Sequence, residues 1–307
     1  MSTTSVRTST LWGLAAITFF GCIATTSAEI VAIPAPHLGD GKTLRAQLFV
    51  PESKAANPRP AAILLHGCGG VGNEGKLNAR HTMWKDWLVE RGFVVVFPES
   101  FTSRGYTEVC TQKFQSRTIK QRDRADDVLA ARKWLTARSD VDASKLVIWG
   151  WSHGGSTTLA TITRGSSATG GFSDETTFTQ AIAFYPGCSL YAAASGPKAI
   201  SSPLALIIGA ADDWTPAAPC KEWIAQIGEK KPGATITLVP GAFHDFDNPA
   251  GKLRVRKDVP NGVNPGQGVT VGPDPVAREA AKAQIDALLR ERGLIATTSA
   301  KANASPN

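Results

Sequence analysis

The stretch that decides the fold runs from Leu146 to Gly155 and reads LVIWGWSHGG. Its first part, Leu146–Trp149, is a continuous apolar run, which is typical of a strand buried on both faces. The next part, Gly150-Trp151-Ser152-His153-Gly154, matches the pattern G-x-S-x-G and precedes a segment with a helical pattern. A strand, a sharp turn and a helix are the context in which this pattern exposes a reactive serine above a sheet edge. Ser152 is therefore a candidate nucleophile.

Other apolar runs share the character of that first strand, and each predicts a buried strand. They are Ala61–Leu65, Phe93–Phe97, Ala181–Phe184, Leu204–Ile208 and Ile236–Val239. Helical patterns lie between them: before Gly92, over 125–135, after Gly154, over 217–228 and over 275–292. Buried strands that alternate with helices predict an α/β fold, a mainly parallel sheet with helices on both faces. Ile30–Ile33 and Leu44–Val50 flank a Gly-Asp-Gly turn and predict an antiparallel hairpin at the start of the sheet.

The amino terminus has the pattern of an export signal. Arg7 is the only charged residue in residues 1–28, and an apolar stretch covers residues 11–24. This stretch is shorter than the roughly 20 residues that span a bilayer. Small residues at 26–28 suit a signal-peptidase site, so we expect cleavage after Ala28, with lipidation at Cys22 as the less favoured alternative. The mature protein is then periplasmic or extracellular, with no segment that holds it in a membrane.

The rest of the chain predicts one domain. With 307 residues, 42% of them hydrophobic, the chain is long enough to bury a large core. We expect an α/β domain over 29–293 and a disordered polar tail over 294–307. Two segments, 165–179 and 250–274, lack the hydrophobic period of a helix or a strand, and we expect them to be loops. Long loops of this kind often act as lids.

The formal net charge of +7 is spread along the chain apart from a short cluster at Lys252–Lys257. No nucleic-acid-binding motif accompanies this charge, so we expect no nucleic-acid partner. The sequence leaves the oligomeric state open.

Partners for Ser152 follow two later strands. A serine hydroxyl needs a neighbouring base, and hydrolases with this motif have the chain order Ser, acid, His. Asp212 and Asp213 follow one strand, and His244 follows the next. Because the carboxyl ends of parallel strands meet at one sheet edge, these loops should lie near Ser152. His244 alone among the histidines comes after the acidic loop, and it is the expected general base.

The loop after Ala61–Leu65 reads His66-Gly67-Cys68-Gly69-Gly70. Hydrolases with this motif take one oxyanion-hole donor from such a loop and one from the residue after the nucleophile. We expect the backbone N–H groups of Cys68 and His153 in this role, with Gly69 as the alternative in the loop. Trp151 and Trp214 adjoin the expected catalytic residues and are candidates for the substrate pocket or for the core.

The same glycine-rich loop has other interpretations. Gly67-x-Gly69-x-x-Gly72 has the spacing of a dinucleotide fingerprint, but no acidic residue ends the next strand near the usual spacing, and Glu90, at about that distance, belongs to a helical segment. Gly70-x-x-x-x-Gly75-Lys76 resembles a phosphate-binding loop, but Leu77 stands where Ser or Thr is needed. We therefore expect no cofactor and no metal. Cys68 is a rival nucleophile, disfavoured because it lies away from the turn at Ser152.

Together these motifs resemble the dienelactone hydrolase family of the α/β-hydrolase superfamily, over roughly residues 30–292. The resemblance rests on residues 66–70, Gly150–Gly155, Asp212–Pro216 and Gly241–His244. It implies an α/β-hydrolase fold with about eight strands and a catalytic triad of Ser152, Asp212 and His244. The family acid stands three residues after a glycine and four before a proline, which selects Asp212 over Asp213.

One departure from the family bears on the activity. Dienelactone hydrolases proper carry Cys as nucleophile, and the position here is Ser152. The resemblance therefore implies a serine esterase that acts on a small-molecule ester through an acyl-enzyme, and the amino-terminal signal pattern predicts that it is secreted. An amidase, a peptidase or a lactone hydrolase on the same triad is the alternative, and a non-catalytic binding protein is the alternative of another class.

Four cysteines remain once Cys22 is removed, and an even count in an exported protein favours disulfides. The count alone leaves three pairings open. In α/β hydrolases the strands before Cys68 and Cys110 are sheet neighbours, as are those before Cys188 and Cys220. The resemblance thus implies the pairs Cys68–Cys110 and Cys188–Cys220, with four buried free thiols as the alternative.

Overall fold

The computed structural model describes residues 28–52, 57–73, 75–165, 172–195, 198–229 and 232–296. The expected signal peptide, the possible lipidation site at Cys22 and most of the expected tail lie outside these residues. The tail was expected from residue 294, but Leu294 and Ile295 are 3% and 9% exposed and pack against the core. The folded domain therefore continues past that boundary, because two apolar side chains follow the last helix.

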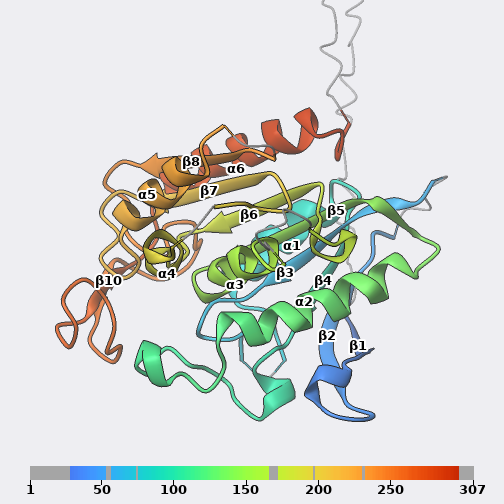
Figure 1. Ribbon diagram of the computed structural model, residues 1–307, viewed down its shortest axis with the longest axis horizontal. Coiled ribbons are helices and arrows are strands. Elements are labelled where there is room, and N and C mark those ends of the chain that lie inside the picture. The colour runs from blue at the N-terminus through green and yellow to red at the C-terminus, as the bar shows by residue number, and fades with distance from the viewer. Residues whose placement is uncertain are drawn as a thin grey trace, which may run out of the picture.

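A twisted sheet runs through the domain and carries the site at its carboxyl edge (Figure 1). Its strands are β1 Glu29–Pro34, β2 Thr43–Phe49, β3 Arg59–Leu65, β4 Val94–Pro98, β5 Val141–Trp151, β6 Gln180–Phe184, β7 Leu204–Gly209 and β8 Ala234–Val239. Their order is β1-β2-β4-β3-β5-β6-β7-β8. β1 and β2 form the antiparallel start, and the strands from β4 to β8 are parallel to one another. This arrangement confirms the expected α/β-hydrolase fold.

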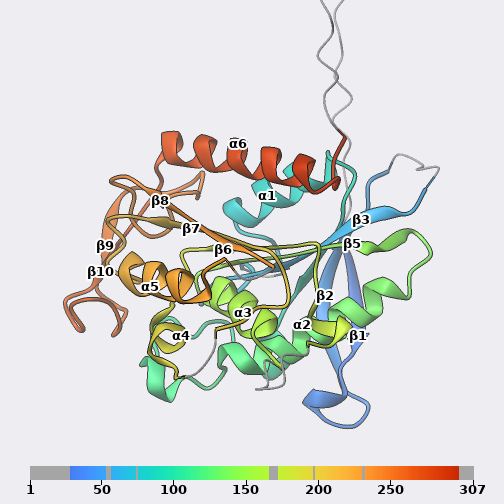
Figure 2. The ribbon, with the colours of Figure 1, turned by 45° about the horizontal axis from the view of Figure 1, so that its top comes forward.

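Helices cover both faces of the sheet. They are α1 Ala79–Val89, α2 Gln121–Thr136, α3 His153–Ile162, α4 Ser189–Ala193, α5 Ala217–Ile227 and α6 Pro275–Glu291. Figure 2 shows α1 and α6 on one face and α2, α3, α4 and α5 on the other. Short 3-10 helices cover Pro36–Leu38, Thr102–Arg104, Phe114–Ser116 and Asp174–Thr176. No described helix is long and apolar enough to cross a membrane.

The central strands are buried along their length, which explains their continuous apolar runs. Every residue of β4, β6 and β7 is buried, as are the last six residues of β5. Burial on both faces requires apolar side chains in both directions of the pleat. The edge strand β8 has no fully buried residue and mixes partly buried with exposed positions.

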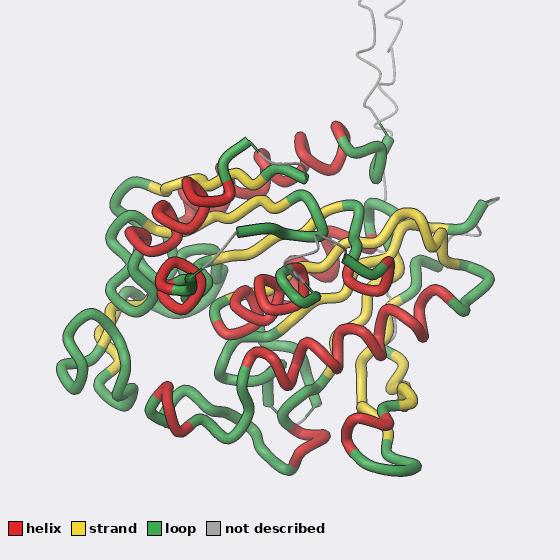
Figure 3. Tube along the Cα trace, viewed as in Figure 1, coloured by secondary structure: helices red, strands yellow, loops and turns green. Residues whose placement is uncertain are grey.

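The segment over 250–274 is mostly loop (Figure 3). It contains two short antiparallel strands that the sequence pattern did not indicate, β9 Arg254–Arg256 and β10 Val269–Val271. Both carboxylate oxygens of Asp213 accept hydrogen bonds from Thr270, at 2.7 and 2.8 Å. The N–H of Gly272 donates to the carbonyl of His244 at 3.1 Å. This segment is therefore tied to the two loops that carry the expected acid and base.

Two disulfides connect loops at the same edge of the sheet. Cys68 pairs with Cys110, and Cys188 pairs with Cys220, each with Cα atoms 4.9 Å apart. The first joins the loops that follow the neighbouring strands β3 and β4, and the second joins the end of β6 to α5. These are the pairs that the family resemblance implied.

Candidate active site

Ser152 lies on a strained turn between β5 and α3. Its backbone has φ +54° and ψ −116°, a region that residues with side chains rarely adopt outside functional sites. The turn needs glycine on both sides. A Cβ at Gly150 would overlap the backbone of Gly154, and a Cβ at Gly154 would overlap the carbonyl of Leu65. The two glycines of the motif thus have a steric reason. β5, α3 and the neighbouring β3 approach one another so closely at these positions that no side chain fits.

The structure places Asp212 against His244 at the ends of β7 and β8. The Oδ2 atom of Asp212 lies 2.8 Å from Nδ1 of His244, and both side chains are almost wholly buried. The Oδ1 atom accepts the backbone N–H groups of Trp214 and Thr215 at 2.9 and 2.8 Å. These contacts hold the carboxylate in one orientation toward the imidazole. Asp213 turns instead toward Thr270 and makes no contact with His244.

Thr215 adds a contact that the sequence analysis missed. Its hydroxyl oxygen lies 3.1 Å from Oδ2 of Asp212 and 3.2 Å from Nδ1 of His244. It also lies 3.0 Å from the carbonyl of Tyr185, to which it can donate. Thr215 therefore braces the Asp212–His244 pair against the end of β6.

The other imidazole nitrogen of His244, Nε2, has no hydrogen-bond partner within the described residues. The hydroxyl of Ser152 therefore makes no hydrogen bond with this nitrogen, and such contacts often tighten only when substrate binds. The rings of Tyr185 and Trp214 pack against the imidazole, with centroids 4.4 and 4.7 Å away. His244 is thus fixed on the Nδ1 side and unpaired on the other.

A cavity of about 200 Å³ opens beside Ser152. Its walls come from the loop before α2 and the start of α2, the turn and start of α3, the start of α4 and the residues before it, the loop after β7, and the segment between β9 and β10. The lining residues are Phe114, Arg117, Gln121, Ser152, His153, Ser156, Gly187, Cys188, Ser189, Leu190, Trp214, Thr215, Pro216 and Asn261. Trp214 belongs to this wall. Trp151 does not, which corrects its candidacy for the pocket: it is fully buried, and its indole donates to Asp247 at 2.8 Å. Because side chains alternate along β5, Trp151 enters the core rather than the site.

Two backbone N–H groups near Ser152 have no acceptor in the described part of the chain. One belongs to Cys68, whose carbonyl accepts from Val109 at 2.8 Å. The other belongs to His153, the first residue of α3, where helical N–H groups lack an intrahelical acceptor. The loop of Cys68 lies close to Ser152, since a Cβ at Gly67 would stand 3.6 Å from the Ser152 Cβ. A disulfide sulfur carries no thiolate, so the pairing with Cys110 argues against Cys68 as nucleophile.

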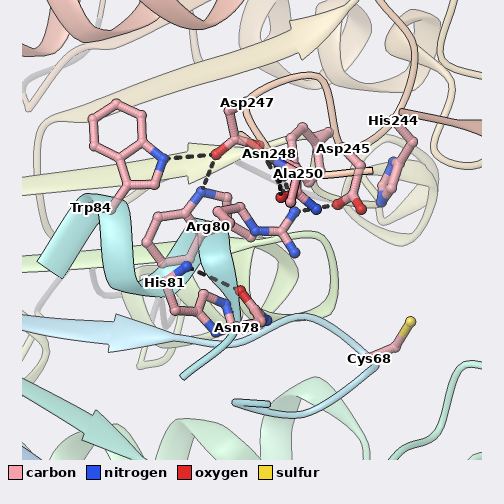
Figure 4. Close-up of polar contacts among 12 residues, drawn as sticks. Cys68, Asn78, Arg80, His81, Trp84, His244, Asp245, Asp247, Asn248 and Ala250 are labelled. Atoms are coloured by element: carbon pink, nitrogen blue, oxygen red, sulfur yellow. Dashed lines mark hydrogen bonds and ion pairs between the residues drawn. The ribbon is translucent and has the colours of Figure 1, made fainter. Parts of the chain in front are cut away.

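A buried polar network supports this edge of the sheet (Figure 4). Asp247 is fully buried, and its Oδ2 accepts the indole N–H groups of Trp84 and Trp151, each at 2.8 Å. Its Oδ1 accepts the hydroxyl of Tyr185 at 2.5 Å. Burial raises the pKa of Asp247, while the guanidinium of Arg80 acts to lower it. The network joins α1 and β5 to the His244 loop.

The same network reaches both expected catalytic side chains indirectly. Trp151 directly precedes Ser152, and the ring of Tyr185 packs on His244. Arg80 donates to the Tyr185 hydroxyl at 2.6 Å and forms an ion pair with Asp245, the residue after His244. Its members stand far apart in the sequence, so no local pattern predicts them. No group of three or more His, Cys, Asp or Glu side chains is arranged for a metal ion among the residues described.

Comparison with known proteins places the chain in a family. The sequence profile described as "Dienelactone hydrolase family" matches residues 44–288. The Uncharacterized protein YfhR of Escherichia coli O157:H7 is 32% identical over 139 residues, which cover 45% of this chain and 43% of that protein. The chain therefore matches less than half the length of this curated relative.

Solved structures share the fold. The dienelactone hydrolase-like promiscuous phosphotriesterase P91 from metagenomic libraries has a TM-score of 0.63 at 18% identity, over 88% of this chain and 99% of that one. The native Est2 esterase of the planctomycete Thermogutta terrifontis has a TM-score of 0.60 at 18% identity, over 89% of this chain and 95% of that one. The profile match covers most of the chain and includes the turn at Ser152, the loop of Asp212 and the loop of His244, and so the protein belongs to the dienelactone hydrolase family.

Proposed function

We propose that the protein is a secreted serine hydrolase that cleaves carboxylic esters of small molecules. The observation that carries this proposal is the buried Asp212–His244 pair, which stands at the same sheet edge as the strained Ser152 and its cavity. A nucleophile, a base and an orienting acid are the parts that acyl transfer requires. Membership of a hydrolase family supports the same reaction class.

The reaction follows from these positions. The Ser152 hydroxyl attacks the acyl carbonyl, and Nε2 of His244 takes its proton. The N–H groups of Cys68 and His153 stabilise the oxyanion. His244 then gives its proton to the leaving alcohol, and Asp212 holds the imidazole in the tautomer with Nε2 free and stabilises the imidazolium. Water then attacks the acyl-enzyme while His244 takes its proton. His244 returns that proton to Ser152 as the carboxylic acid leaves.

Three observations support ester cleavage and export as parts of the proposal. Serine in place of cysteine at position 152 favours ordinary ester cleavage over lactone cleavage. One structural relative is named an esterase and another a promiscuous phosphotriesterase, so ester chemistry of two kinds occurs on this fold. Two disulfides are typical of proteins in an oxidising compartment, which agrees with the export signal expected at the amino terminus.

Hydrolysis of p-nitrophenyl esters of increasing acyl length tests the proposal, with the matched p-nitroanilides beside them. We expect turnover of the esters to exceed that of the anilides. Ser152→Ala should lower kcat by about 10⁴- to 10⁶-fold, and adding His244→Ala should change little more, because triad members act as a unit. Faster cleavage of the anilides would indicate an amidase, and full activity in Ser152→Ala would refute the mechanism.

A further inference from the structure

Arg124, on α2, is a fully buried cation that forms no ion pair with a carboxylate in the described ranges of the chain. Its side chain reaches past the ring of Phe101, whose centroid lies 5.1 Å from the guanidinium carbon. Its Nε and Nη2 atoms have no partner within the described chain. Burying a cation without an opposite charge costs folding free energy. The few hydrogen bonds that Arg124 does make therefore indicate why it is buried here.

The buried carboxylate on the same helix is engaged elsewhere. Asp127 lies three residues further along α2 and is fully buried. It accepts from Nε2 of His37 at 2.7 Å and from Nη1 of Arg104 at 2.8 Å. His37 and Arg104 therefore satisfy the Asp127 carboxylate without a hydrogen bond from Arg124.

Both bonds of Arg124 come from one nitrogen and reach two different segments. Nη1 donates to the carbonyl of His66 at 2.9 Å and lies 2.9 Å from Nδ1 of His153. His66 stands two residues before Cys68, and His153 directly follows Ser152. These are the two segments whose backbone N–H groups are proposed to bind the oxyanion.

The imidazole of His153 is held in one protonation state and one tautomer. Burial and the neighbouring Arg124 lower the pKa of His153 well below its usual value, so the ring is neutral. Its Nδ1 accepts from Arg124, which leaves the proton on Nε2, 3.2 Å from the carbonyl of Ile119. Burial lowers the pKa of Arg124 to about 9, so the guanidinium stays charged at neutral pH.

We propose that Arg124 is a positioning residue for the oxyanion hole, since its Nη1 sets the spacing between the Cys68 and His153 N–H groups. The inference rests on the esterase function proposed above. Donors stabilise an oxyanion only when they lie at hydrogen-bond distance from the place where charge develops. Arg124 touches no substrate and acts through the peptide units that it holds.

The test compares Arg124→Met and Arg124→Lys with Arg104→Met. Arg104 also bonds α2, through Asp127, but contacts neither oxyanion segment. We would measure kcat and KM on the best p-nitrophenyl ester, inhibition by phenylboronic acid, which forms a tetrahedral adduct with a reactive serine, and Tm.

Arg124→Met should lower kcat about 10- to 100-fold, somewhat less than outright loss of a donor, with KM within about threefold of the wild-type value. Boronic-acid inhibition should weaken in parallel, and Arg124→Lys should recover part of kcat. Arg104→Met should lower Tm as much but keep kcat within about twofold, because it leaves the donors in place.

An Arg124→Met protein that is folded and has the kcat of Arg104→Met would overturn the inference. If Arg124→Met does not fold, His153→Leu takes its place, because it removes the ring acceptor and keeps the N–H of residue 153. A wild-type kcat in folded His153→Leu would equally overturn it. Absence of ester hydrolysis in the wild-type protein would instead overturn the proposed function.

Discussion

Oδ2 of Asp212 lies 2.8 Å from Nδ1 of His244, while the adjacent Asp213 bonds Thr270 in the following segment. Two neighbouring carboxylates thus have different tasks. One orients the imidazole, and the other anchors the segment that contains β9 and β10.

Asp212→Asn should lower kcat by about 10⁴-fold, because an amide in this position favours the wrong imidazole tautomer. Asp213→Asn should keep kcat within about tenfold, since it weakens only the hydrogen bonds to Thr270. Steady-state kinetics of both variants on one ester measures the contrast. A larger loss in Asp213→Asn would show that the acid has been assigned to the wrong residue.

Asp247→Asn should destabilise the protein by about 2–4 kcal/mol, because every group around this carboxylate is a donor and an amide presents N–H groups to some of them. Urea unfolding, followed by tryptophan fluorescence, measures the change. Asp286→Asn is a suitable control, because Asp286 lies on α6 with its side chain 24% exposed. Equal free energies of unfolding for the two variants would contradict the structural role of the network.

The strands and most helices could be predicted because their signals are local. Buried parallel strands give continuous apolar runs, and Ser152 stands in a motif whose glycines are required by the close crossing of β3, β5 and α3. The five-residue α4 and the three-residue β9 and β10 were missed because such short elements carry no measurable period.

Contacts across the fold could not be predicted in the same way. Asp247 binds Trp84, 163 residues away in the sequence, and Arg124 binds His66, 58 residues away. Only the fold brings these partners together. Trp151 directly precedes Ser152 and Trp214 lies two residues after Asp212, yet one packs in the core and the other lines the cavity. Position beside a motif does not settle the direction of a side chain.

Reduction of the disulfides should lower activity before the core unfolds. Cys68–Cys110 braces the loop of an expected oxyanion donor, and Cys188–Cys220 joins a residue of the cavity wall to α5. We would follow ester hydrolysis and far-UV circular dichroism over a series of dithiothreitol concentrations. Simultaneous loss of both signals would contradict the prediction, as would free thiols at all four positions in non-reducing peptide maps.

Acid should weaken the fold through Asp127. Burial acts to raise the pKa of Asp127, but hydrogen bonds from His37 and Arg104 outweigh it and hold the pKa below its usual 3.8. A depressed pKa in the folded state stabilises the protein above the unfolded value, and this contribution is lost as pH falls through the folded value. Urea unfolding from about pH 5 to about pH 2 should show falling stability. The free energy of unfolding should fall less steeply with decreasing pH in Asp127→Asn than in the wild-type protein. Identical pH dependence in the two proteins would contradict this role of Asp127.

Covalent labelling tests the central claim, that Ser152 is the nucleophile, most directly. Paraoxon should transfer its diethylphosphoryl group to the serine oxygen and release p-nitrophenol, with loss of esterase activity in proportion. Tandem mass spectrometry of the tryptic peptide between Lys145 and Arg164 locates the adduct, because that peptide contains both Ser152 and Ser156. The account predicts one phosphoryl group on Ser152 and none in Ser152→Ala. An adduct on Ser156 or outside this peptide, with activity retained in Ser152→Ala, would contradict it.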